Sequence, residues 1–124
     1  MVLSRREFRR LVSEAIASLP PAVLQRLENV EVVVEDRPTR DDLAMAGIEP
    51  SETLFGLYSG TPLAERGSSY GMVLPDKITL YQRSIEEFCR TKRQVREQIR
   101  VTLMHEIGHH FGLSEDELEE AGYE

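Results

Sequence analysis

The stretch that decides the fold is "VREQIRVTLMHEIGHHFG", which runs from Val95 to Gly112. Its apolar positions recur every three or four residues, which predicts one long amphipathic helix with a buried face. Thr91 and Gln94 have the spacing of a capping box, so we expect the helix to begin there. Gly112 suits the position just past its end. The predicted buried stripe consists of Val95, Ile99, Thr102, Leu103 and Ile107.

The same helix carries every histidine of the chain, at positions 105, 109 and 110. His105 and His109 are one helical turn apart, ~6 Å along the axis, and leave from the same face. Two imidazoles so placed can converge on one tetrahedral Zn²⁺. Glu106 is offset by about 100°, so it can reach a water on the metal more easily than the metal itself. His-Glu-x-x-His therefore predicts ligand, general base and ligand.

A catalytic zinc site needs a third protein ligand, and the candidates are carboxylates. A glycine at position 112 allows a sharp turn that would bring the following acidic residues under the metal. We prefer Glu115, with Asp116 as the close second and an upstream carboxylate as a further alternative. Glu117 to Glu120 are expected to be a solvated first turn of a helix, which also remains an alternative for the whole acidic run. His110 points about 100° away from His109, so we expect a packed residue there.

The rest of the chain predicts an α+β domain with a small mixed or antiparallel sheet, a long active-site helix and a short C-terminal helix. Helical spacing follows the capping boxes that start at Ser4, Ser84 and Ser114, and a helical turn is expected after Thr39. Pro21 can open a short helix. Three segments are expected as strands: "NVEVVVED" (29–36), "ETLFGLYSG" (52–60) and "KITLYQ" (77–82).

Length and composition limit the class of protein. The 124 residues, 40% hydrophobic and 30% charged, favour a single globular domain over residues 1–124. No apolar run approaches the ~20 residues that span a bilayer, and no signal-peptide pattern follows the first arginines, so we expect no membrane association. The single cysteine, Cys89, is expected to pack in the core and fits a cytoplasmic location. A net charge of −7 argues against nucleic-acid binding.

The motif "HEIGHHFG" resembles that of the zincin metallopeptidases. The longer pattern H-E-x-x-H-x-x-G-x-x-E is similar to the metzincin motif, but Glu115 stands where metzincins have His, and no methionine follows. The closer resemblance is to small bacterial zincin-like proteins described as minimal metallopeptidase folds, and it covers nearly the whole chain. It implies a minimal zincin-like fold, His105 and His109 as metal ligands, Glu106 as base and an acidic ligand at 115, where that family often has Asp.

These observations lead to the hypothesis of a zinc-dependent peptidase with one Zn²⁺ per chain and a peptide or protein substrate. An extended peptide would pair with a strand beside the cleft, for which residues 52–60 and 77–82 are the candidates. The alternative is a non-catalytic metal-binding or protein-interaction module of the same fold. A third reading, a chance motif in a helical domain, predicts no stoichiometric metal.

Overall fold

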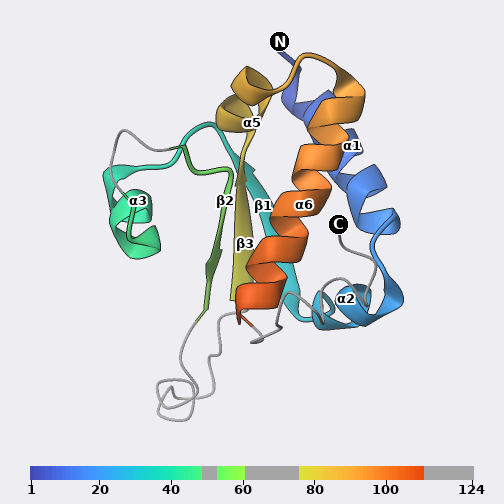
Figure 1. The fold of residues 1–124 in the computed structure, drawn as a ribbon, viewed down its shortest axis with the longest axis vertical. Helices are drawn as coiled ribbons and strands as arrows, with labels where there is room; N and C mark the ends of the chain where they lie inside the picture. Colours follow the sequence, from blue (N-terminus) through green and yellow to red (C-terminus); the bar gives the residue numbers. More distant parts are fainter. Residues whose placement is uncertain (49–52, 61–75, 111–124) are drawn as a thin grey trace.

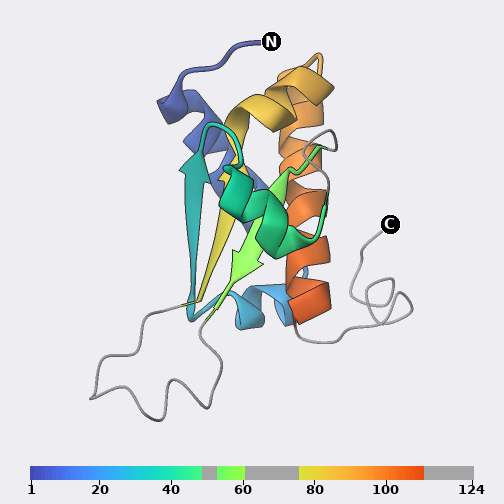
Figure 2. The same ribbon diagram turned by 90° about the vertical axis from the view of Figure 1, so that its left-hand side faces the viewer.

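The structure, a computed structural model, describes residues 1–48, 53–60 and 76–110. A small sheet lies between helices on both of its sides: α1 and α6 cover one side and α3 lies on the other (Figures 1 and 2). The elements in chain order are α1 (Arg5–Ala17), α2 (Pro21–Arg26), β1 (Val30–Glu35), α3 (Arg40–Ala46), β2 (Gly56–Ser59), β3 (Asp76–Tyr81), α5 (Gln82–Phe88) and α6 (Lys92–His110).

The three described strands form one mixed sheet in the order β1-β3-β2. The central strand β3 pairs in parallel with β1, with Val32 opposite Ile78. On its other side β3 pairs antiparallel with β2, with Tyr58 also opposite Ile78. The predicted α+β class with a small mixed sheet is confirmed. The second strand is shorter than predicted, because among the described residues of the expected segment 52–60 the strand comprises Gly56–Ser59.

Helix α6 is the central element of the core. The hydroxyl of Thr91 accepts a hydrogen bond from the Gln94 amide at 3.1 Å, as the capping box predicts. Each fully buried aliphatic side chain contributes about 1.5–3 kcal/mol of transfer free energy. The burial of these side chains holds one face of α6 against the sheet and α1. The α6 side chains with no exposed surface are Val95, Ile99, Leu103, Met104 and Ile107.

Among the described residues, no helix is long and apolar enough to cross a membrane.

The predicted first helix is also confirmed, and it packs along α6. The Ser4 hydroxyl caps α1 by accepting the Glu7 amide at 3.0 Å. The buried stripe of α1 consists of Phe8, Leu11, Val12 and Ala15. Cys89 belongs to the same core, and burial raises the pKa of its thiol, which suits the packing role expected for it.

The capping box expected at Ser84 is wrong. Helix α5 follows β3 directly and starts at Gln82, so Ser84 is buried inside the helix. An acidic residue of the same helix pairs with the N-terminal segment instead. The buried Glu86 carboxylate accepts the Leu3 amide at 3.0 Å and the Gln82 side-chain amide at 2.8 Å. A polar group is tolerated in this core because it is paired, and it holds the N-terminal segment.

A close approach between α6 and β2 depends on a glycine. A Cβ added at Gly56 would lie 2.6 Å from Cγ2 of Thr102 and 3.2 Å from the carbonyl oxygen of Thr79. The first distance is shorter than real carbon contacts, so any side chain at position 56 would push α6 away from the strand.

We predict that Gly56→Ala lowers the free energy of unfolding by about 1–3 kcal/mol, the usual cost of overpacking. Urea denaturation followed by circular dichroism measures this. Thr102→Ser removes the clashing methyl group and keeps the hydroxyl that donates to the Gln98 carbonyl at 2.7 Å. The double variant should therefore recover part of the loss, whereas Thr102→Ser alone should not stabilise the protein. A Gly56→Ala variant as stable as the wild type would show that the contact is not tight.

Candidate metal centre

The two motif histidines lie in the last turns of α6. Residues 105 and 109 both fall within the continuous helix Lys92–His110, so the one-turn separation expected from the sequence is present. The His105 side chain is partly exposed. Leu103 and Ile107, on either side of it in the chain, are fully buried, so the core contacts of α6 turn the face that carries His105 outward.

Glu106 reaches the edge of the sheet. Its carboxylate Oε1 accepts a hydrogen bond from the backbone N–H of Tyr58 in β2, at 2.7 Å. A bond to a charged acceptor is stronger than one between neutral groups, and this one is partly buried. The carboxylate is therefore held at a defined place beside the strand, one residue along the helix from His105.

The Tyr58 amide points away from the rest of the sheet. On the inner side of β2, the Phe55 carbonyl accepts the Tyr81 amide at 3.0 Å, which shows that residue 55 faces β3. Successive residues of a strand direct their backbone groups to opposite sides. Gly56 and Tyr58 therefore present their amides and carbonyls at the outer edge of β2, and Glu106 bonds to one of them.

A second contact joins the end of α6 to the sheet. The His110 ring stacks on the Tyr58 ring, with centroids 3.7 Å apart and planes 13° apart. The Tyr58 hydroxyl donates to Oδ2 of Asp76 at 2.9 Å, and the same oxygen lies 3.8 Å from Nε2 of His110. These three side chains, which we name the Tyr58 brace, link α6, β2 and β3. His110 thus contacts the Tyr58 ring, but its side chain is 37% exposed, so it is not the packed residue that the sequence predicts.

Several carboxylates surround the sheet near this centre. The pKa of Tyr81 is raised well above its ordinary value, first by burial, then by Asp42, and to a smaller extent by the charges of Glu35 and Glu106. The side chain has no exposed surface. Burial and the neighbouring carboxylates therefore both favour the protonated phenol.

Sequence reasoning did not identify Tyr58 or Asp76 as part of the centre. Tyr58 lies in a segment whose only sequence signal was its strand propensity. Asp76 is the first residue of β3 and directly precedes the predicted strand 77–82, where an acidic residue is ordinary. Only the pairing of β2 with β3 brings these two residues together beneath the end of α6.

The described residues hold part of the expected ligand set. Among the described side chains of residues 1–48, 53–60 and 76–110, which leave out that of His109, no three of His, Cys, Asp or Glu are grouped so that they could hold a metal ion. The side chain of His109 and the candidates Glu115 and Asp116, with Gly112, lie outside what the structure describes. The donor chemistry is nevertheless suitable, because imidazole and carboxylate are ligands that zinc accepts.

The chain belongs to the zincin-like metallopeptidase family, whose family model matches residues 27–123. This match covers β1 through α6 and continues beyond the motif. Membership implies zinc binding in general, and it agrees with the α+β fold described above. A search of curated proteins finds no match.

The fold is similar to that of a solved structure. That structure is a conserved hypothetical protein from Thermo thermophilus, with a TM-score of 0.56 and 24% sequence identity. The alignment covers 88% of this chain and 94% of that one. At this level of identity the likeness concerns the fold alone.

We predict that Tyr58→Phe lowers the free energy of unfolding by about 0.5–1.5 kcal/mol, because it removes the hydrogen bond to Asp76 and keeps the ring on His110. Tyr58→Leu should cost more, since the stacked pair is lost as well. Urea denaturation measures both variants. If the Phe variant is as stable as the wild type, the Tyr58 hydroxyl does not contribute to the brace. If the two variants are equally stable, the ring stacking does not contribute.

Proposed function

We propose that this protein is a zinc-dependent peptidase in which His105, His109 and Glu115 hold one Zn²⁺ and Glu106 is the general base. The observation that carries the proposal is the fixed position of the Glu106 carboxylate, bonded to the Tyr58 amide beside His105. A glutamate that served only to solvate the helix would be expected to extend into water. This one is directed to the edge of the sheet, where an extended peptide can bind.

The motif and the family support this choice of ligands. His105 and His109 are one turn apart, and a carboxylate from the segment after Gly112 would complete a set of three protein ligands. Asp116 remains the alternative to Glu115. A zinc ion bound there would polarise the scissile carbonyl and lower the pKa of a water molecule.

Glu106 would perform the proton transfers. Its carboxylate accepts the proton of the attacking water and then delivers that proton to the nitrogen of the leaving amine. The Tyr58 amide orients the carboxylate for this task without taking up a proton itself. General acid–base catalysis of this kind typically contributes ~10²–10⁴-fold.

The sheet topology supports β2 as the strand that binds the peptide. Strand β3, which contains most of the candidate segment 77–82, has a partner on each side, so its backbone groups are occupied. Of the described strands, β2 lies at the edge next to α6, and Gly56 and Tyr58 face outward there. An extended peptide could add to this edge by backbone hydrogen bonds beside the Tyr58 amide, which already donates to Glu106. This mode of binding requires little sequence specificity.

We predict one Zn²⁺ per chain in the wild type and none in the double variant His105→Ala, His109→Ala, because the chain has only one other histidine. Elemental analysis after gel filtration measures the stoichiometry. In the same experiment Glu115→Ala should weaken zinc binding and Asp116→Ala should not. The reverse ranking would assign the third ligand to Asp116, and an unchanged zinc content in the double histidine variant would eliminate this site.

We predict that Glu106→Gln keeps the zinc content and loses at least ~10²-fold in the rate of peptide cleavage, because Gln can accept the Tyr58 amide but cannot take up the proton. Zinc stoichiometry and cleavage of a peptide library are measured on the same preparation. Exposed Glu28, between α2 and β1, provides the matched control, and Glu28→Gln should retain wild-type cleavage.

Two results would contradict this assignment. Retained cleavage in Glu106→Gln would remove the residue from the mechanism, and lost zinc would make it a ligand. A wild type that binds zinc and cleaves no peptide of a broad library would favour the non-catalytic metal-binding module.

A further inference from the structure

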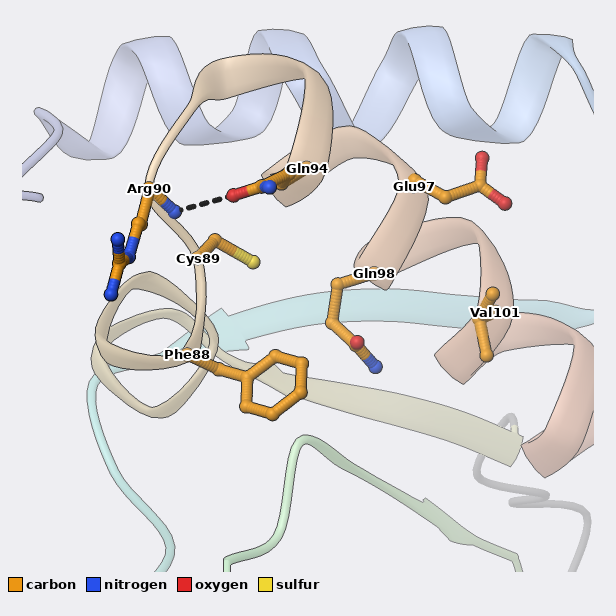
Figure 3. A pocket seen from close by; sticks show the side chains of 7 residues that line it. All are labelled: Phe88, Cys89, Arg90, Gln94, Glu97, Gln98 and Val101. Carbon is orange, nitrogen blue, oxygen red and sulfur yellow. Dashed lines mark hydrogen bonds between the residues drawn. The ribbon is translucent and has the colours of Figure 1, made fainter.

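A pocket of about 310 Å³ lies between the end of α5 and the first turns of α6. The Phe88 ring stands at one side, and the Gln98 and Val101 side chains of α6 lie across from it (Figure 3). Cys89 also lines the pocket, on the side of Arg90 and Gln94. The proposed metal and base residues do not line this pocket, so the proposed chemistry does not account for it.

The pocket shares the outward face of α6 with His105. Gln98 precedes His105 by seven residues, close to two full turns, so their side chains leave α6 in nearly the same direction. Val101 precedes His105 by four residues and belongs to the same face. Along the axis, Gln98 and His105 are separated by about 10 Å. This distance corresponds to about three residues of an extended chain.

The pocket also lies at the start of the edge strand. The Phe88 ring packs on the ring of Phe55, with centroids 5.1 Å apart, and Phe55 directly precedes β2. The Gln98 side-chain amide donates to the Thr102 hydroxyl at 3.2 Å, and Thr102 is the residue in close contact with Gly56. A peptide that follows the outer edge of β2 past Glu106 therefore reaches the pocket.

The lining favours an uncharged side chain. Phe88 is 67% exposed, an unusual state for a phenylalanine, and with Val101 it gives the pocket apolar walls. The charged residues of the lining, Arg90 and Glu97, carry opposite signs, so the pocket has no net charge. Its volume accommodates one large side chain with room to spare.

We propose that this pocket binds a large apolar side chain, aromatic or branched aliphatic, of a peptide held along β2, about three residues from the cleaved bond. The proposal rests on the proposed peptidase function for the location of that bond. It assigns a specificity-determining role to Phe88 and Val101. The peptide backbone bound at β2 would supply affinity, and this pocket would select among sequences.

The test is a set of peptides that contain one cleavable bond and carry Phe or Ala at each position from two to five residues on either side. For the wild type, Phe should raise kcat/KM by about tenfold or more at one position three or four residues from the bond, the scale expected for burying one large apolar side chain. Phe88→Ala and Val101→Trp should each remove this preference, the first by opening the pocket and the second by filling it.

Met45 provides the matched control. It is a large apolar residue, 65% exposed, on α3 at the other side of the sheet. Met45→Ala should keep the full preference for Phe. Because Phe88 is on the surface, its variant should fold, and circular dichroism checks both pocket variants. A preference that persists in Phe88→Ala and Val101→Trp, or that is absent from the wild type, would overturn the proposal.

A binding measurement separates this proposal from the peptidase function. The Glu106→Gln variant is titrated with fluorescent forms of the same peptides, and anisotropy gives the affinity. Tighter binding of the Phe peptide, lost in Phe88→Ala, supports the pocket even if the wild type cleaves nothing. Cleavage without any preference at these positions supports the peptidase and overturns the pocket.

Discussion

The contact between Gly56 of β2 and Thr102 of α6 is the constraint on which the arrangement of the centre depends. Because position 56 has no side chain, α6 approaches the edge strand so closely that no Cβ atom would fit between them. One turn further along α6, Glu106 can then reach the Tyr58 amide, and one turn beyond that His110 can stack on the Tyr58 ring. A wider spacing between helix and strand would break both contacts, because hydrogen bonds and ring stacking act over short distances.

Much of the fold could be predicted from the sequence. The helical spacing of Val95, Ile99 and Leu103 specifies a buried face, and these residues are fully buried. The valines of residues 30–35 likewise marked a strand. The start of α5 could not be predicted, because Ser84 has an ordinary capping pattern. Its burial results from the direct passage of β3 into the helix and from the pairing of Glu86 with Leu3, which are tertiary contacts.

The centre was predictable to the extent that it lies on one helix. The spacing of His105, Glu106 and His109 is local information, and a helix converts it into a geometry. The partners of that helix are not local. Tyr58 is 48 residues from Glu106, and nothing in its neighbourhood indicates which strand becomes the edge of the sheet. That choice is decided when β3 takes the central place, which pattern reasoning on single segments cannot determine.

The hydrogen bond between Glu106 and Tyr58 ties the proposed base to an element of modest local stability. Strand β2 has four residues, and in the described part of the chain its only strand partner is β3. Edge elements with few ladder bonds open at lower free energy than the core around them. A small local opening of this edge would release the carboxylate while α1 and α6 remained packed. If Glu106 is the base, as proposed, the opening of this one short strand would disturb the centre while the rest of the fold remains packed.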